Sequence, residues 1–273
     1  MKISLLEPLR VSKEYIEELA QPLKDLGHEF VYHETKTTDP DELYERSKDS
    51  EVVIIANNPY PKEVIEKLDK TKFIDVAFTG VDHVDNASAK EKGIKIANAS
   101  GYATQAVAEL SIGLALNVLR EVKQGDLDVR KGDDFPGLIQ GQEIHGKTVG
   151  IIGTGTIGIH TAKLFKAFGA KVLGYNRSEK QEAIDAGVEY VSLDTLIKES
   201  EIISIHLPMT EDTKHTIGER ELDNMKESAI LINVARGPII DNEALANALN
   251  EGKIAGAGID VFDMEPPIPN DYP

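Results

Sequence analysis

Short apolar runs alternate with amphipathic segments through the first hundred residues of the chain. Runs such as KISLLE and EVVIIA are typical of buried strands, and the segments between them repeat apolar residues at helical spacing, as at Ile16, Leu19 and Leu23. This alternation predicts a parallel sheet with helices on both faces. The expected strands are residues 2–7, 28–33, 51–56, 72–80 and 94–98, and the expected helices are residues 12–26, 39–47, 61–68 and 85–93.

The middle of the chain contains a long apolar helix and then a polar stretch. Val107, Leu114 and Val118 share one face of a helix within residues 99–122, and the opposite face also carries few charges. We therefore expect this helix to be buried on most sides, as a bridge between domains or a subunit contact. Residues 124–146 are polar and glycine-rich without a period, so we expect an arm or subunit contact without regular structure.

The alternation of strands and helices resumes after residue 147. It predicts a second doubly wound sheet, so the fold class is α/β with two doubly wound parallel-sheet domains. The expected strands are residues 148–152, 170–176, 188–192, 201–208, 228–237 and 253–262, and the expected helices are residues 157–168, 182–187, 193–200, 219–226 and 241–252.

Charge and composition narrow the range of partners. The 273 residues include 47 acidic and 30 basic ones, for a formal net charge of −17. An acidic surface argues against a nucleic-acid or anionic-membrane partner. The chain has no cysteine, which excludes disulfides, thiolate metal sites and a cysteine nucleophile, and we expect no metal. The N-terminal apolar stretch is too short for a signal peptide and no apolar run approaches membrane-spanning length, so we expect a cytoplasmic protein.

The stretch TVGIIGTGTIG, residues 148–158, predicts a dinucleotide-binding turn. A β-branched run ends in three spaced glycines, and a helix-like segment follows at once. In such a unit the first glycine permits a tight turn, the second lets the pyrophosphate approach the backbone, and the third lets the helix pack close to the strand. The helix N-terminus then offers N–H groups to the phosphates; the alternative is a glycine-rich connection without a ligand. The predicted turn comprises Gly153, Gly155, Thr156, Ile157 and Gly158.

The residues about 20 positions past the glycines bear on the choice of cofactor. NAD-binding units usually carry Asp or Glu there to hold the ribose 2′-hydroxyl. This chain has Asn176, followed by Arg177 and Ser178. A neutral residue removes repulsion toward a 2′-phosphate, and the arginine and hydroxyl can bind it, so we expect NADP or dual NAD and NADP use. The alternative is that Arg177 stacks on the adenine and the cofactor is NAD.

Two turns follow strands of the first predicted sheet. Parallel sheets bind ligands at the carboxyl ends of their strands. The segment 57–59, Asn-Asn-Pro, follows the third strand, and Gly80 follows the fourth, where its backbone can present N–H groups to a carboxylate. The alternative is that both segments are ordinary turns between strand and helix.

Several segments occur in an order that resembles one known family. TGVDHVD and NASGYATQAVAEL precede the glycine turn, and HLPMTEDTKHTIG, LINVARGPIID and GAGIDVFDMEP follow it. In this order they resemble the D-isomer-specific 2-hydroxyacid dehydrogenases over nearly the whole chain. The resemblance implies a flavodoxin-like substrate-binding domain at residues 1–98, without its usual C-terminal return segment. It implies a Rossmann NAD(P)-binding domain at residues 99–273, with an interface helix and arm at residues 104–146.

The resemblance also implies roles for individual residues. Arg236 resembles the arginine that grips the substrate carboxylate and carbonyl; the alternative is a surface arginine beside a turn. Glu265 resembles the glutamate that pairs with a catalytic histidine and raises the pKa of its imidazole. The implied substrate-binding residues besides Arg236 are Gly80, Val81 and Tyr102. The implied cofactor-lining residues outside the glycine turn and residues 176–178 are Thr104, His206, Pro208, Thr213, Val234 and Asp260.

The implied activity is reversible hydride transfer between NAD(P)H and a small 2-keto acid, which yields a D-2-hydroxy acid. The implied assembly is a homodimer through the cofactor domain. One alternative is a non-catalytic NAD(H)-sensing protein on the same fold. The formate-dehydrogenase branch is disfavoured because it has glutamine at the position of Glu265.

The chain departs from the family pattern at the catalytic histidine. In the family this histidine follows the glutamate, whereas all seven histidines here precede Arg236 and the sequence ends at Pro273. We therefore expect a truncated chain. If the chain is complete, we expect severely impaired hydride transfer.

Overall fold

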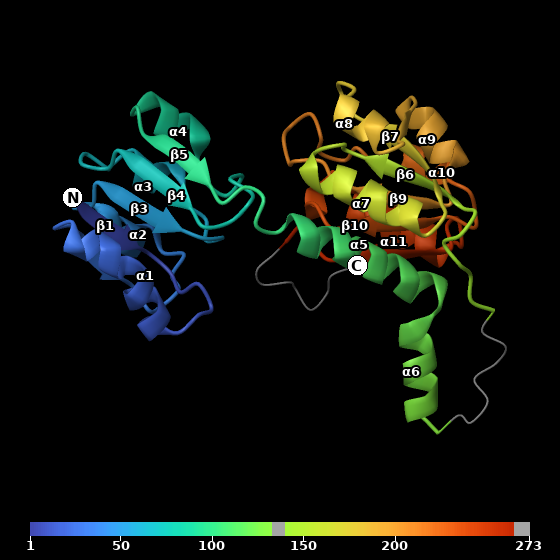
Figure 1. The fold of residues 1–273 in the computed structure, drawn as a ribbon, viewed down its shortest axis with the longest axis horizontal. Coiled ribbons are helices and arrows are strands. Elements are labelled where there is room, and N and C mark those ends of the chain that lie inside the picture. The colour runs from blue at the N-terminus through green and yellow to red at the C-terminus, as the bar shows by residue number, and fades with distance from the viewer. Residues whose placement is uncertain (133–139, 265–273) are drawn as a thin grey trace. The chain divides into compact units, whose positions relative to one another are not determined.

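The computed structural model describes residues 1–132 and 140–264 of the chain (Figure 1). Contacts within the chain divide it into two compact units, residues 1–102 and residues 103–273. The boundary that the sequence predicts, residue 98, lies near this division. Each unit is built around its own parallel sheet.

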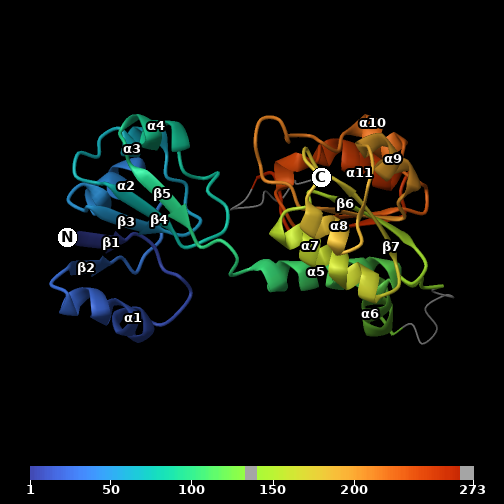
Figure 2. The ribbon, with the colours of Figure 1, turned by 45° about the horizontal axis from the view of Figure 1, so that its top comes forward.

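The described part of the first unit contains a five-stranded sheet in the order β2-β1-β3-β4-β5, with all pairs parallel. This is the flavodoxin-like strand order, as the sequence predicts. Figure 2 shows α1 on one face of the sheet and α2, α3 and α4 on the other. The strands are β1 (Lys2–Leu5), β2 (Glu29–Tyr32), β3 (Val52–Ile55), β4 (Phe73–Val76) and β5 (Lys95–Asn98), and the helices are α1 (Lys13–Asp25), α2 (Pro40–Ser47), α3 (Lys62–Ile65) and α4 (Asn86–Glu91).

Side-chain caps begin three helices of the first unit. Ser12 accepts a hydrogen bond from the backbone N–H of Tyr15, and Asp85 accepts one from Ser88. Asp39, the expected cap of α2, accepts from the backbone N–H groups of residues 41 and 42. These bonds satisfy donors that a helix start leaves without a partner, so each helix begins where the sequence predicts within a residue or two.

The described part of the second unit contains a six-stranded parallel sheet in the order β11-β10-β9-β6-β7-β8. Counted from β6, this is the order 3-2-1-4-5-6 of dinucleotide-binding sheets. The strands are β6 (Thr148–Ile152), β7 (Lys171–Tyr175), β8 (Glu189–Tyr190), β9 (Ile202–Ile205), β10 (Ile230–Asn233) and β11 (Gly256–Ile259). The helices are α5 (Thr104–Leu119), α6 (Val122–Arg130), α7 (Thr156–Ala167), α8 (Gln181–Asp185), α9 (Leu193–Glu199), α10 (Glu219–Asp223) and α11 (Asn242–Asn250), with a 3-10 turn η1 (Gly237–Ile239).

Apolar cores cover both faces of this second sheet. Phe165 of α7 and Ile112 of α5 pack in one core, and Leu222 of α10 and Leu245 of α11 pack in the other. Figure 2 shows the same division, with α5 and α7 on one face and α9, α10 and α11 on the other. Because helices cover both faces, the central strands are mostly apolar, and their carboxyl ends remain as the open edge.

The structure corrects two expectations about residues 99–146. Helix α5 buries one stripe, which includes Ala108, Ile112 and Ala115, but Leu110 is 37% exposed, so the helix is not buried on most sides. Residues 122–130 form helix α6 rather than an irregular arm. Side-chain pairs at helical spacing, such as Arg130 with Asp126, stabilise α6 although its sequence lacks an apolar period. Residues 133–139 of the predicted arm lie outside the described residues.

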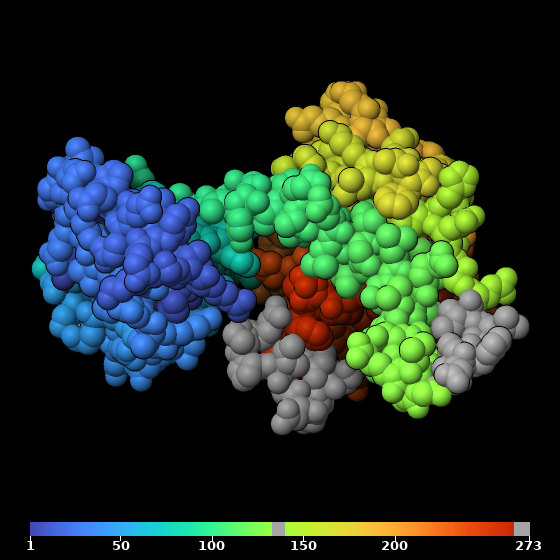
Figure 3. All heavy atoms as spheres, turned by 60° about the horizontal axis from the view of Figure 1, so that its bottom comes forward, coloured from blue at the N-terminus to red at the C-terminus, as the bar shows by residue number. Residues whose placement is uncertain are grey.

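Helix α6 projects from the rest of the second unit (Figure 1). It continues the surface of α5, as the green and light-green atoms of Figure 3 show. None of its residues is buried, and Val122 and Val129 are 54% and 65% exposed.

Within residues 1–132 and 140–264, no helix is long and apolar enough to cross a membrane.

Candidate active site

The glycine turn after β6 is shaped by two close backbone approaches. Gly153 has φ +97°, and a Cβ there would lie 2.7 Å from the carbonyl carbon and oxygen of His206. A Cβ on Gly158 would lie 2.0 Å from the carbonyl oxygen of Gly153. Both positions therefore require glycine for steric reasons, and α7 can start directly against the end of β6.

Gly155 differs from its two neighbours because a Cβ there would meet no atom within 4 Å. Gly155 is the N-cap of α7 and offers no side chain to its first N–H groups. Open space in front of an uncapped helix start is where a dinucleotide pyrophosphate binds in this type of fold. The neighbouring Thr156 is exposed and Ile157 is half-buried. The residues present therefore fit the pyrophosphate of a dinucleotide.

The loop after β7 carries the residues predicted to discriminate between cofactors. The side-chain amide of Asn176 donates a hydrogen bond to the carbonyl oxygen of Ser178 (2.8 Å) and closes a tight turn. Arg177 and Ser178 are exposed, and Arg177 makes no side-chain hydrogen bond or ion pair with the described residues. The guanidinium is therefore available to a ligand.

The segment after β9 lies directly beside the glycine turn. The backbone N–H of His206 donates to the carbonyl oxygen of Ile152 (2.7 Å), and its Nε2 lies 2.9 Å from Oγ of Ser204. Thr213 donates to the carbonyl oxygen of Pro208 (2.7 Å), so the loop that contains these two residues is closed on itself. Desolvation lowers the pKa of His206 to about 3, which keeps the imidazole neutral at neutral pH.

The Arg236 segment follows β10 and is held by an asparagine that the sequence reasoning does not single out. Asn233, 1% exposed, donates from its side chain to the carbonyl oxygen of Arg236 (2.9 Å) and accepts from the N–H of Ala235 (3.0 Å). One buried amide thus donates one hydrogen bond and accepts another, and the two bonds fix the backbone that presents the guanidinium. A polar residue inside the apolar run of β10 is the signal in the sequence that points to Asn233.

The absence of a side chain at Gly237 lets the segment after β11 lie against the residue that follows Arg236. A Cβ at Gly237 would lie 2.0 Å from the carbonyl carbon of Phe262, so the chain after β11 passes directly over this glycine. The exposed Asp260 lies in the same segment and donates its backbone N–H to the carbonyl oxygen of Asn233 (3.0 Å). Partial burial raises the pKa of the Asp260 carboxyl above its usual range. Glu265 lies outside the described residues.

The predicted cofactor residues of the second unit therefore share one edge of the sheet. The turn after β6, the loops after β7, β9 and β10 and the segment after β11 all lie at the carboxyl ends of parallel strands. Val234, 7% exposed, belongs to the apolar core below this edge, and Thr104 is the first residue of α5, which packs on α7, β10 and β11.

The first unit gathers its predicted substrate residues in the same way, at the carboxyl end of β4. Gly80 and Val81 are half-buried in the loop after β4. The ring of Tyr102, 61% exposed, lies 6.3 Å from that of Phe78, centre to centre, which brings Tyr102 to the same loop. The side-chain amide of Asn98 donates to the carbonyl oxygen of Thr79 (2.6 Å) and holds the loop in place.

A buried glutamate that the sequence reasoning does not assign to the site organises the neighbouring loop after β3. The carboxylate of Glu7, 1% exposed, accepts from the backbone N–H groups of Ala56 (2.8 Å) and Asn58 (3.0 Å). Charge-assisted bonds of this kind are stronger than neutral ones. Oδ1 of Asn58 and Oγ1 of Thr79 are buried without a hydrogen-bond partner among the described residues, so a polar group of a ligand or a water can satisfy them.

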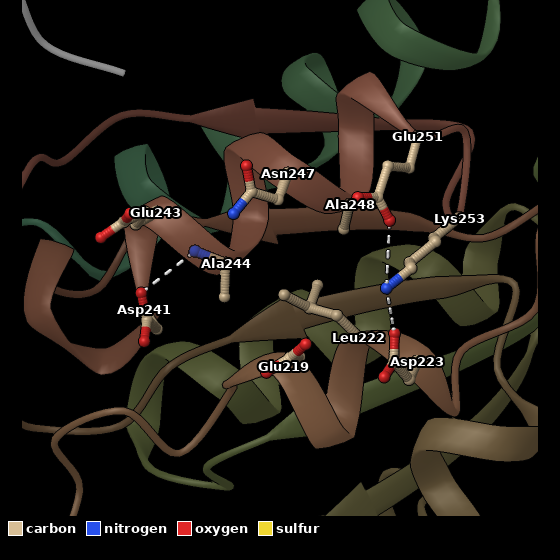
Figure 4. A pocket seen from close by; sticks show the side chains of 10 residues that line it. All are labelled: Glu219, Leu222, Asp223, Asp241, Glu243, Ala244, Asn247, Ala248, Glu251 and Lys253. Carbon is tan, nitrogen blue, oxygen red and sulfur yellow. Dashed lines mark hydrogen bonds and ion pairs between the residues drawn. The ribbon is translucent and has the colours of Figure 1, made fainter.

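A separate hollow of about 240 Å³ lies between α10 and α11 (Figure 4). Lys253 bridges Asp223 (2.6 Å) and Glu251 (3.2 Å) across it, and these bonds raise the pKa of the lysine. Asp241 lines the hollow as the N-cap of α11. The carboxylates around it repel an anionic dinucleotide, and the residues that line it include no predicted cofactor residue.

The strand order and the glycine turn together define a dinucleotide-binding protein of the Rossmann class. The family model described as D-isomer specific 2-hydroxyacid dehydrogenase, NAD binding domain, matches residues 112–273. The glyoxylate reductase of Thermofilum pendens is 40% identical over 249 residues, which are 88% of this chain and 74% of that protein. The chain belongs to the D-isomer specific 2-hydroxyacid dehydrogenase family, as the sequence predicts.

Two solved structures are similar to the whole chain. An acyclic imino acid reductase in complex with NADPH and D-Arg has a TM-score of 0.88 at 31% identity, and the match covers 98% of this chain and 85% of that one. A D-lactate dehydrogenase from Aquifex aeolicus, complexed with NAD and lactic acid, has a TM-score of 0.84 at 32% identity and coverages of 96% and 77%. These matches confirm the predicted fold class and give no support to the alternative of a non-catalytic sensor.

The different surroundings of Gly155 and Gly158 predict different effects of one added methyl group. We expect Gly155→Ala to leave the free energy of unfolding within about 1 kcal/mol, because the new Cβ meets no atom. The methyl group occupies the space that the pyrophosphate needs, so the Kd for NADH and NADPH rises at least about tenfold. Gly158→Ala is the matched control and lowers stability by about 2 kcal/mol or more. Calorimetric titration and urea unfolding measure both effects, and unchanged cofactor affinity in Gly155→Ala contradicts the assignment.

The lowered pKa of His206 predicts that its imidazole stays neutral from pH 8 to about pH 4. The unfolded chain takes up this proton near the ordinary pKa of 6.5, so the contribution of His206 to stability falls as the pH drops from 6.5 toward 3. Ring-nitrogen NMR shifts, assigned with His206→Gln, report the protonation state. A transition near pH 6 contradicts the prediction.

Proposed function

We propose that this protein reduces small 2-keto acids to D-2-hydroxy acids with hydride from NADH or NADPH. The observation that carries the proposal is the edge formed by β6, β9 and β10. Three segments follow strands that are adjacent in the sheet: the open glycine turn after β6, the segment after β9 with the neutral imidazole of His206, and the loop after β10 with Arg236. The identity to a glyoxylate reductase supports the same substrate class.

The residues of the second unit would hold the dinucleotide at this edge. The N–H groups at the start of α7 bind its pyrophosphate, and Asn176, Arg177 and Ser178 bind the adenosine ribose. His206, Pro208, Thr213, Val234, Asp260 and Thr104 line the remainder of the cofactor site. When bound, the reduced nicotinamide supplies hydride to the carbonyl carbon of the substrate.

The remaining roles concern the substrate. Arg236 offers a planar pair of donors to the carboxylate and carbonyl, and it stabilises the negative charge that develops on the carbonyl oxygen. Backbone N–H groups at Gly80 and Val81 bind the carboxylate, and Tyr102 contacts the substrate. Glu265 would raise the pKa of a histidine that protonates the carbonyl oxygen. In the family this histidine follows the glutamate, and none of the seven histidines within residues 1–273 has that place. Desolvation lowers the pKa of His206, which disfavours it as that proton donor.

We further propose a cytoplasmic homodimer that associates through α5 and α6. Leu110 of α5 and Leu127 of α6 are 37% and 39% exposed, and α6 projects from its unit with no buried residue. Exposed leucines on two consecutive helices support a contact with a second copy of the chain. In the same proposal residues 1–98 bind the substrate and residues 99–273 bind the cofactor.

The proposed reaction predicts that Arg236→Lys retains the fold and lowers kcat/KM by about a hundredfold, because lysine lacks the bidentate fork. The full-length protein is assayed for oxidation of NADH and NADPH with glyoxylate, pyruvate and hydroxypyruvate. Arg220→Lys is the control, because Arg220 is a surface residue that pairs with Asp194. The proposal fails if the wild type oxidises neither cofactor with any 2-keto acid, or if Arg236→Lys equals the control.

The exposed Arg177 predicts that the protein binds NADPH at least as tightly as NADH. Arg177→Gln removes a charge-assisted contact to the 2′-phosphate and raises the Kd for NADPH about tenfold, while the Kd for NADH changes less than about twofold. Calorimetric titration measures both constants. Lys198→Gln on α9 is the control for the loss of one surface charge. A large preference of the wild type for NADH, or equal effects on both cofactors, contradicts the prediction.

A further inference from the structure

The hydroxyl of Tyr190 joins two segments of the second unit that are distant in the sequence. It lies 2.6 Å from Oγ1 of Thr154, which stands between Gly153 and Gly155 in the glycine turn. It also accepts a hydrogen bond from the backbone N–H of Lys180 (3.1 Å), at the end of the loop after β7. One hydroxyl group therefore connects the turn that faces the pyrophosphate to the loop that contains Arg177 and Ser178.

The Thr154 end of this connection is anchored in the interior. Thr154 is 0% exposed. A Cβ on Gly174 would lie 2.4 Å from Cγ1 of Val188 and 3.3 Å from Cγ2 of Thr154, so glycine at residue 174 leaves room chiefly for the valine and places the threonine in the same packed region. Tyr190 pairs with Gly174 across β7 and β8, which brings its ring to the same place. The position of the tyrosine hydroxyl is thus set by the sheet and by a buried partner.

The Lys180 end of the connection limits the movement of the loop. The loop after β7 is fixed at its start by the bond from the Asn176 amide to the carbonyl oxygen of Ser178. It is fixed at its end by the bond from the Lys180 N–H to Tyr190. Arg177 and Ser178 are exposed between these two points. A loop with both ends fixed loses less conformational freedom when it binds a ligand than a loop with one free end.

We propose that Tyr190 is a positioning residue for cofactor discrimination. Its hydroxyl holds the loop of residues 176–180 at a set distance from the glycine turn, so that Arg177 and Ser178 meet the 2′-substituent of the adenosine ribose while the pyrophosphate lies on the turn. The inference rests on the proposed dinucleotide site and adds a residue that acts through its hydrogen bonds to Thr154 and Lys180. Phenylalanine at this position retains the ring and loses the connection.

The test compares the binding of NADPH and NADH to wild type and Tyr190→Phe by calorimetric titration. We expect the Kd for NADPH to rise about fivefold and the Kd for NADH to change less than about twofold, since only the 2′-side contacts depend on the loop. Thr154→Val removes the other hydroxyl and shifts the ratio of the two constants in the same direction. Thr154→Ser retains the hydroxyl, so the ratio of the two Kd values stays that of the wild type. The double variant Tyr190→Phe with Thr154→Val adds little to Tyr190→Phe alone.

Controls separate this inference from a general loss of structure and from failure of the proposed function. Tyr15→Phe, on the exposed face of α1, leaves both constants unchanged. If the Kd of Tyr190→Phe rises equally for both cofactors, or does not rise for either, the positioning role is wrong while the proposed function stands. If the wild type binds neither NADH nor NADPH, both the proposed function and this inference are wrong.

Discussion

The second unit depends on the absence of side chains where β6 meets α7. The carbonyl oxygen of Gly153 lies so close to Gly158 that a Cβ there would be 2.0 Å away, and Gly153 itself lies against His206. These contacts bring the helix start to the sheet edge and bring the segment after β9 beside it. The same packing leaves Gly155 facing open space. Steric exclusion at two glycines and open space at the third together shape the turn that we propose for the cofactor.

The strand ends are held by hydrogen bonds from buried polar groups. Asn233 fixes the Arg236 backbone, Glu7 fixes the loop after β3, and Tyr190 joins the glycine turn to the loop after β7. Each polar group is partly or wholly buried. Inside a protein a hydrogen bond is stronger than in water, and its loss is more costly. The loops that carry the predicted binding residues are thereby held in place by groups of the protein itself.

Most of the architecture could be predicted from the sequence because buried parallel strands are apolar runs and several helices, such as α1, α2 and α11, begin at a clear side-chain cap. Helix α6 could not, since charged pairs such as Arg130 with Asp126 stabilise it in place of an apolar stripe. The glycine turn was visible as a local motif. The roles of Asn233 and Tyr190 depend on contacts set by the folded chain: the partner of Tyr190, Thr154, is 36 residues away. Local patterns do not contain such pairings.

The close passage of Phe262 over Gly237 has a consequence for how the family can vary. The carbonyl carbon of Phe262 would be only 2.0 Å from a Cβ on Gly237, so no side chain can separate the two backbones. Insertions or deletions just after β11 would push directly on the residue that follows Arg236. A change of length between the end of β11 and Phe262 would therefore disturb the backbone that presents Arg236.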